Sequence, residues 1–196
     1  MPMENENHRT IKYLTQEEVA RLFAKIHSKR DRAMFNVIYK YGLRIAEVGL
    51  LKIDDVDLER RRINICRLKG SVSGEYPLFS DTARTLKAYL KERGNDFHSP
   101  LFLSKQKRAI SPRMLEVLFH DYAQKAKLPK DRRHPHVLKH SIVVHMLDAG
   151  HSQEEAKYQV GHKRISSTDV YAAVSGRKRK QIFEHMERAR EIVSFS

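Results

Sequence analysis

Apolar residues recur at intervals of three and four positions along most of the chain, a spacing typical of amphipathic helices. The first expected helix follows Thr15 and Glu18, which form a capping-box pattern, and its apolar positions are Val19, Leu22, Phe23 and Ile26. Further helices are expected at about residues 32–41, 45–51, 81–92, 112 onward, 137–149, 153 onward and 178–192. Gly42 and Gly150 follow two of these stretches, as expected for residues that end helices.

The spacing changes between residues 62 and 78. Residues 62–68 are rich in β-branched side chains, residues 70–74 have the composition of a turn, and residues 75–78 can return as a second strand. We therefore expect one mostly α-helical domain that carries a small antiparallel β-sheet, an α+β fold class.

Composition adds a strong basic charge. The 196 residues include 38 Lys and Arg against 24 Asp and Glu, a net charge of +14. Basic residues cluster at about 105–108, 125–133 and 177–180, which favours a nucleic-acid-binding surface, although charge alone also fits a surface kept basic for solubility.

The single cysteine, Cys66, excludes an internal disulfide and a thiolate metal cluster. No apolar run is long enough for a membrane span or a signal core, so we expect no membrane partner and a cytoplasmic location.

One set of residues carries more information than the charge. In order along the chain it comprises Gly42-Leu43-Arg44-x-x-Glu47, Lys69, His136-x-x-Lys139-His140, Gly161-His162 and Tyr171. This order and spacing resembles the catalytic domain of tyrosine recombinases, also called phage integrases, over about residues 12–190.

The resemblance implies a tyrosine recombinase fold and a chemistry that needs no metal ion and no other cofactor. Tyr171 would be the nucleophile and form a 3′-phosphotyrosyl bond, while Arg44 would clamp the scissile phosphate. Lys69 on the hairpin would protonate the leaving oxygen, with Arg67 as an alternative for that position. His136 and His162 would bind phosphate oxygens or move protons, and Glu47 and His140 would support the catalytic side chains.

Lys139 departs from the family pattern, which has arginine at this position. Lysine keeps the charge and loses the planar fork that grips two phosphate oxygens at once. Three interpretations stay open: a slower natural enzyme, a relative that binds DNA and cleaves it poorly, and a deliberate substitution. The second would be a binding module that regulates recombination or transcription, and relaxation of supercoiled DNA by the same chemistry is a third function class.

The resemblance also suggests an organisation and partners. Residues 1–11 are a polar lead and residues 12–196 the catalytic domain, without the N-terminal core-binding domain that such proteins usually carry. The chain is then either part of a longer protein or similar to naturally short invertases. Residues 177–196 are a candidate protomer-exchange segment, with packing on their own domain as the alternative.

The expected partners are double-stranded DNA and further copies of the chain, as a tetramer on DNA. Candidate DNA contacts are Arg113, Lys105, Lys107, Arg108, Arg132 and Arg133.

Overall fold

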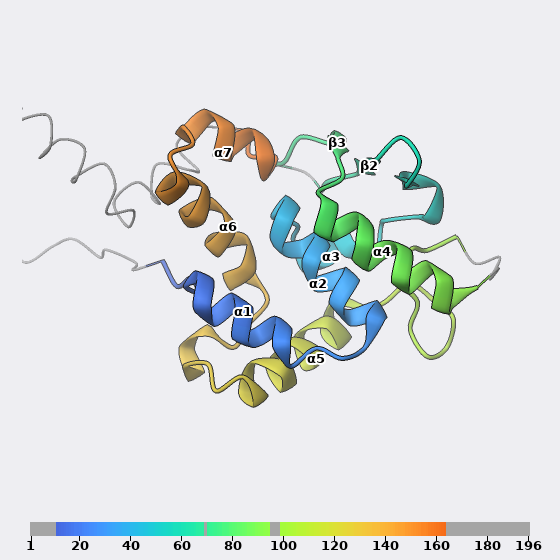
Figure 1. The fold of residues 1–196 in the computed structure, drawn as a ribbon, viewed down its shortest axis with the longest axis horizontal. Helices are drawn as coiled ribbons and strands as arrows, with labels where there is room; N and C mark the ends of the chain where they lie inside the picture. Colours follow the sequence, from blue (N-terminus) through green and yellow to red (C-terminus); the bar gives the residue numbers. More distant parts are fainter. Residues whose placement is uncertain (1–10, 69, 95–98, 164–196) are drawn as a thin grey trace, which may run out of the picture.

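The computed structural model describes residues 11–68, 70–94 and 99–163 (Figure 1). Its α-helices are α1 (Gln16–Ala24), α2 (Lys29–Tyr41), α3 (Ile45–Val48), α4 (Ser80–Arg93), α5 (Pro112–Lys125), α6 (His136–Ala149) and α7 (Gln153–Gln159). Its strands are β1 (Val56–Asp57), β2 (Arg62–Ile65) and β3 (Gly74–Pro77), and two 3-10 turns cover Ile53–Asp55 and Lys130–Arg132. None of the helices in these residues is long and apolar enough to cross a bilayer. The helix expected at 178–192 lies outside the described residues.

Local signals at the helix ends are confirmed. The capping-box hydrogen bonds form at Thr15 and at Ser152, and Gly42 and Gly150 both adopt the left-handed conformation at helix C-termini. The boundaries differ in two places. Helix α2 begins three residues earlier than expected because the Ser28 side chain accepts a hydrogen bond from the Asp31 amide and caps it. The helix expected at 45–51 is a single turn, α3, which ends at Val48.

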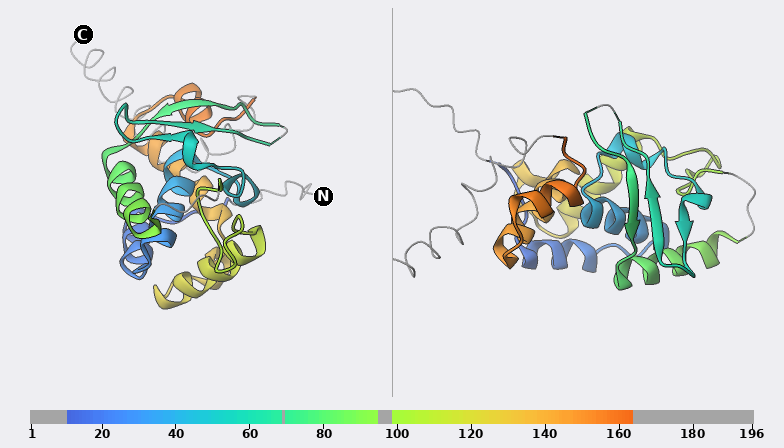
Figure 2. Two further views of the ribbon diagram at one scale, coloured as in Figure 1. Left: turned by 90° about the vertical axis from the view of Figure 1, so that its right-hand side faces the viewer. Right: turned by 90° about the horizontal axis from the view of Figure 1, so that it is seen from above.

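The sheet has three antiparallel strands in the order β1-β2-β3, one more than the expected hairpin. Val56 pairs with Ile63, which pairs in turn with Tyr76. Strand β1 has two residues, too few to show the alternation of apolar and polar positions that marks a strand in a sequence. The sheet forms a layer along one side of the helices (Figure 2). Its buried side chains are those of Ile63, Ile65 and Tyr76.

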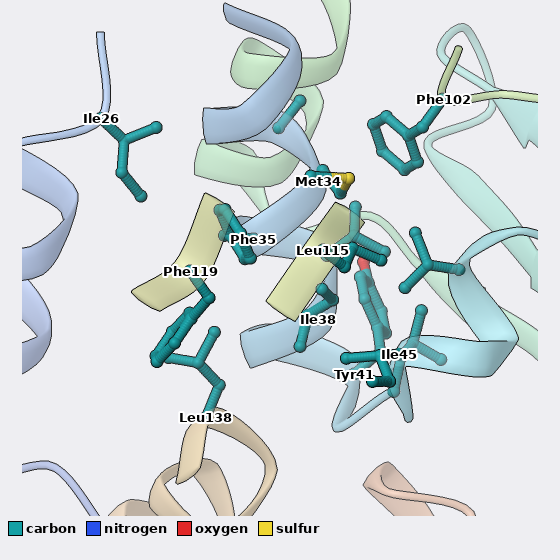
Figure 3. Packing of buried hydrophobic residues seen from close by; sticks show 14 of the residues in the cluster. Ile26, Met34, Phe35, Ile38, Tyr41, Ile45, Phe102, Leu115, Phe119 and Leu138 are labelled. Atoms are coloured by element: carbon teal, nitrogen blue, oxygen red, sulfur yellow. The ribbon is translucent and has the colours of Figure 1, made fainter. Parts of the chain in front are cut away.

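Helix α2 is the centre of the core. It packs against α4 and α6 and is buried along most of its length. Phe35 of α2 meets Phe119 of α5 edge to face, with the ring centroids 5.6 Å apart, and Leu138 of α6 lies close to Phe119 (Figure 3). The helices together with the three-stranded sheet confirm the α+β fold class, and the C-terminal half of α2 is buried among its neighbours.

Helices α6 and α7 share a smaller cluster of buried apolar residues, Val143, Val144, Leu147, Ala156 and Val160. This cluster fixes α7 on the second half of α6. The C-terminal end of α7 lies beside the β2–β3 hairpin (Figure 1), so residues 160–162 meet the hairpin loop.

Candidate active site

Two helix C-termini meet at the candidate site. Helix α2 ends at Gly42, with φ of 58°, and helix α7 is followed by Gly161, with φ of 66°. A Cβ atom on Gly42 would lie 2.5 Å from Cγ1 of Val160, and one on Gly161 would lie 2.4 Å from Nε of Arg67. Both positions therefore need glycine, for the positive φ and for the close approach of the two helix ends.

Arg44 stands two residues beyond Gly42 and is held by Glu47. The Glu47 carboxylate is fully buried and accepts hydrogen bonds from the Arg44 amide (2.8 Å), from Arg44 Nη1 (3.2 Å) and from the Leu68 amide (3.2 Å). Arg44 Nη1 also donates to Ser71 Oγ in the hairpin loop. The Arg44 side chain remains 36% exposed, so one edge of its guanidinium is anchored and another faces solvent.

Arg67 is buried, in contrast with Arg44. Its side chain is 0% exposed, and its Nη2 donates to the carbonyl oxygens of Tyr41 (2.7 Å) and Gln159 (3.3 Å). Nη1 donates to the Gly42 carbonyl (3.4 Å) and lies 3.7 Å from Glu47 Oε2. A guanidinium enclosed in this way cannot reach a leaving oxygen on DNA. This enclosure argues against Arg67 as the alternative to Lys69, which itself lies outside the described residues.

Lys139 is in the first turn of α6, and its side chain is buried. Its Nζ donates to the carbonyl oxygens of Gly42 (2.8 Å) and Val160 (3.2 Å), one from each helix end. Burial, together with the positive charges of Arg67 and Arg44, lowers the pKa of Lys139 to about 7, while the Glu47 carboxylate opposes the shift.

Three histidines surround these cations. His136 is exposed at the start of α6, His140 is half-buried one turn later, and His162 is buried next to Gly161. Burial, together with the nearby positive charges, lowers the pKa of His140 and of His162 to about 4. The pKa of His136 is also lowered, chiefly because neighbouring atoms partly desolvate its ring and then because of nearby positive charges. At neutral pH these imidazoles are uncharged, so each can donate one hydrogen bond and accept another.

The hairpin loop closes one side of the site. Ser71 pairs with His162 in an isolated antiparallel bridge, and the Val72 amide donates to the Gly161 carbonyl (2.9 Å). Ser71 thus joins Arg44 to the end of α7. No sequence motif marks Ser71, because a serine that follows a glycine in the segment 70–74 has the composition of an ordinary turn.

The structure brings Arg44, Glu47, Lys139, His140 and His162 together, with His136 at the rim. Tyr171 lies outside the described residues. Within the described part of the chain, no three His, Cys, Asp or Glu side chains converge as metal ligands would.

The candidate DNA contacts fall into two sets. Lys105, Lys107 and Arg108 are exposed on a loop closed by the pairing of Leu103 with Ala109, and Arg113 is exposed in the first turn of α5. The other two are engaged with the fold. Arg132 forms an ion pair with Glu18 at 3.0 Å, and Arg133 Nε donates to the Leu128 carbonyl at 2.8 Å.

Comparison with known proteins agrees with this arrangement. The model of the Phage integrase family matches residues 12–177. Tyrosine recombinase XerA of Thermococcus onnurineus is 33% identical over 184 residues, which is 92% of this chain and 62% of the relative. Tyrosine recombinase XerC of Chromobacterium violaceum is 31% identical over 156 residues, 79% of this chain and 52% of the relative. The chain thus spans between about half and three-fifths of the length of these two curated relatives.

Solved structures share the fold. The crystal structure of XerA recombinase superposes with a TM-score of 0.77 at 24% identity and covers 94% of this chain and 66% of that one. XerH recombinase, solved on its palindromic difH substrate after cleavage, gives a TM-score of 0.75 at 21% identity, covering 90% of this chain and 53% of that one.

Proposed function

Because the chain belongs to the phage integrase family, we propose that it is the catalytic domain, residues 12–196, of a site-specific DNA recombinase. It cuts and rejoins DNA through a 3′-phosphotyrosyl intermediate without metal or ATP. The observation that carries this proposal is the meeting of Arg44, Lys139 and His162 at two facing helix ends. These residues come from three distant segments of the chain, each in the place where the family pattern has a catalytic residue. The XerH structure described as a post-cleavage complex on its DNA substrate supports the reaction class.

In the proposed reaction, the Tyr171 oxygen attacks the scissile phosphorus and the bond from phosphorus to the 5′ oxygen breaks. The electron pair of that bond goes to the 5′ oxygen, which takes a proton from Lys69. The uncharged imidazole of His162 or His136 accepts the tyrosine proton, because a phenol with a pKa of about 10 is a poor nucleophile until it is deprotonated. Rejoining reverses the step with a 5′ hydroxyl as the attacking group.

Arg44 is the residue best suited to stabilise the phosphate. Negative charge grows on the non-bridging oxygens as the tyrosine attacks, and without a metal ion it must be met by side-chain cations and hydrogen-bond donors. Arg44 presents an exposed guanidinium edge that Glu47 and Ser71 hold from behind. Such an arrangement needs little reorganisation during the reaction.

The proposed partners are double-stranded DNA and further copies of the chain. The exposed basic residues Lys105, Lys107, Arg108 and Arg113 would contact phosphates and base edges. Assembly as a tetramer on two duplexes, with residues 177–196 exchanged between protomers, is the organisation that the family pattern implies. A XerH complex with palindromic difH and a Tn1549 transposon integrase complex with circular-intermediate DNA show relatives held on DNA.

The test is a covalent trapping assay on nicked duplexes from the regions that flank the gene. The wild-type chain should form a denaturant-resistant protein–DNA adduct, and Tyr171→Phe should abolish the adduct while it leaves the gel-shift affinity unchanged. Tyr158→Phe is the matched control, because Tyr158 is 74% exposed and outside the set of proposed catalytic residues, and it should behave as wild type. An adduct that survives Tyr171→Phe, or binding by every variant without any adduct, would contradict the proposal.

A further inference from the structure

We propose that Arg67 and Lys139 act together as positioning residues that set Arg44 and His162 relative to each other for strand cleavage. This inference rests on the proposed function for its consequence in catalysis. Its structural basis is a pair of buried cations that bridge two helix C-termini.

The last carbonyl groups of a helix have no partner within the helix and must find donors elsewhere. At the end of α2, the carbonyl of Lys40 accepts from the Gln159 side chain (2.8 Å), that of Tyr41 from Arg67 and that of Gly42 from both Arg67 and Lys139. At the end of α7, the carbonyls of Gln159 and Val160 accept from Arg67 and Lys139 respectively.

Each cation therefore bonds to both helix ends. Arg67 joins Tyr41 to Gln159, Lys139 joins Gly42 to Val160, and the two share the Gly42 carbonyl as an acceptor. The negative ends of two helix dipoles face this pair, which offsets part of the cost of burying its positive charge. The two side chains also arrive from different elements, Arg67 from just after β2 and Lys139 from α6, so four segments are tied together.

This bridge lies directly behind the candidate catalytic residues. Arg44 follows the Gly42 carbonyl by two residues, and His162 follows Val160 by two residues. Any change in the separation of the two helix ends would change the separation of Arg44 and His162. Misplacing a catalytic group by about 1 Å can lower a rate about 100-fold, so the bridge bears on the reaction without touching DNA.

The bridge also offers a physical reason for lysine at position 139. The Arg67 guanidinium fills the space beneath Gly161 and already donates to Gly42. An arginine at position 139 would bring a second planar guanidinium to the same carbonyl. The compact ammonium of lysine fits there and still reaches both helix ends. In this view, the Lys139 departure is matched by Arg67 and is not a simple loss of a phosphate clamp.

The experiment is a swap of the two side chains. Lys139→Arg, Arg67→Lys and the double variant are compared in single-turnover trapping with saturating DNA, with the folded fraction measured on the same samples by thermal unfolding. Arg62→Lys is the control, since Arg62 is exposed on β2, five residues before Arg67, and pairs with Glu75. We expect each single change to lower the cleavage rate of the folded, bound protein about 10- to 100-fold, and the swap to recover most of that loss.

The binding constant for DNA should change little in all four variants, which separates positioning from phosphate binding. Two results would overturn the inference: losses that simply multiply in the double variant, and a Lys139→Arg variant faster than wild type. If the wild-type chain forms no Tyr171-dependent adduct, the proposed function fails separately. The pairing of Arg67 with Lys139 is then decided by the urea concentrations at which the same variants are half unfolded. Additive shifts of this midpoint in the double variant would overturn the pairing, and a midpoint that recovers in the double variant would support it.

Discussion

At the scale of single residues, Glu47 organises the charges of the site. It is a fully buried carboxylate with Arg44 on one oxygen and Arg67 near the other. It also accepts from two backbone amides, so it fixes both the side chain and the chain direction of Arg44. A buried anion among several cations is costly to remove, because the cations that remain lose their compensation.

Glu47→Gln tests this role, since it keeps the shape and removes the charge. We expect the free energy of unfolding to fall by about 3–5 kcal/mol, and adduct formation to fall further than the folded fraction, because Arg44 loses its anchor. Asp57→Asn is the matched control, as Asp57 pairs with Arg60 at the surface, and it should cost less than about 1 kcal/mol. Urea unfolding and trapping on the same samples check both; equal losses for the two variants would contradict the role of Glu47.

At the scale of elements, the stability of helix α7 affects the candidate active site, because site residues follow its C-terminal end. The helix is short, its N-terminus is closed by the Ser152–Glu155 capping box, and its C-terminal end carries Val160, Gly161 and His162. Helix α1 begins with the same type of box, at Thr15, and contacts α5. The two caps are alike in chemistry and differ in what lies at the other end of the helix.

Ser152→Ala and Thr15→Ala should each lower the free energy of unfolding by about 1 kcal/mol, because each removes one capping hydrogen bond. Only Ser152→Ala should also slow single-turnover cleavage, since fraying of α7 moves His162 and the carbonyls that bind Arg67 and Lys139. Cleavage that slows equally in both variants would mean that general stability, and not the position of α7, governs the rate.

At the scale of the whole molecule, the net charge of +14 should govern DNA affinity. Which basic residues take part depends on their place in the fold. Arg113 and Lys125 are at opposite ends of α5, twelve residues or about 18 Å apart along the helix axis, which exceeds a screening length of about 8–10 Å. Removing either one subtracts the same charge from the same helix.

Arg113→Ala should weaken DNA binding most at low salt and lower the steepness of log affinity against log salt by about one. Lys125→Ala should leave both nearly unchanged, because Lys125 pairs with Asp121 one turn away. Gel shifts over a series of salt concentrations measure the slopes. Identical slopes for the two variants would indicate a diffuse charge effect without a defined contact surface.

The free energy of unfolding should depend on pH through His140, His162 and Lys139, whose pKa values the fold lowers. The pKa of His140 and of His162 falls from an ordinary value of 6.5 to about 4 in the fold. Between those values the unfolded chain binds protons that the folded chain does not, so the free energy of unfolding should rise from pH 4 to 6.5. By the same reasoning, Lys139, with its pKa lowered from 10.5 to about 7, makes stability rise between pH 7 and 10.5.

Replacing both His140 and His162 with glutamine should flatten the acid part of this curve alone, and Lys139→Met the alkaline part alone. Urea unfolding at pH 5, 7 and 9 distinguishes the two arms, and each variant is the control for the other. A curve that keeps its full slope in both variants would show that other groups carry the pH dependence.

Much of this protein was determined by the sequence itself. The capping boxes at Thr15 and Ser152 and the helix end at Gly42 depend on residues within four positions of one another, so they can be predicted locally. The α+β class follows from the change of periodicity near residue 62, and the family pattern marks Arg44, His136, Lys139 and His162 as candidates. The two-residue strand β1 escaped prediction, because its partner in β2, and not its own pattern, makes it a strand.

Only the tertiary structure decided which of the basic candidate residues are accessible and which are enclosed. Arg44 and Arg67 are both basic residues next to glycine-containing loops, yet Arg44 is partly exposed and Arg67 is enclosed. The difference arises because Arg67 finds acceptors 26 and 92 residues away, at Tyr41 and Gln159. Lys139 likewise finds Gly42 at a separation of 97 residues. Such partners are set by the packing of α2 against α6 and α7, which no local pattern contains, because the free carbonyls of a helix end take whichever donors the fold brings to them.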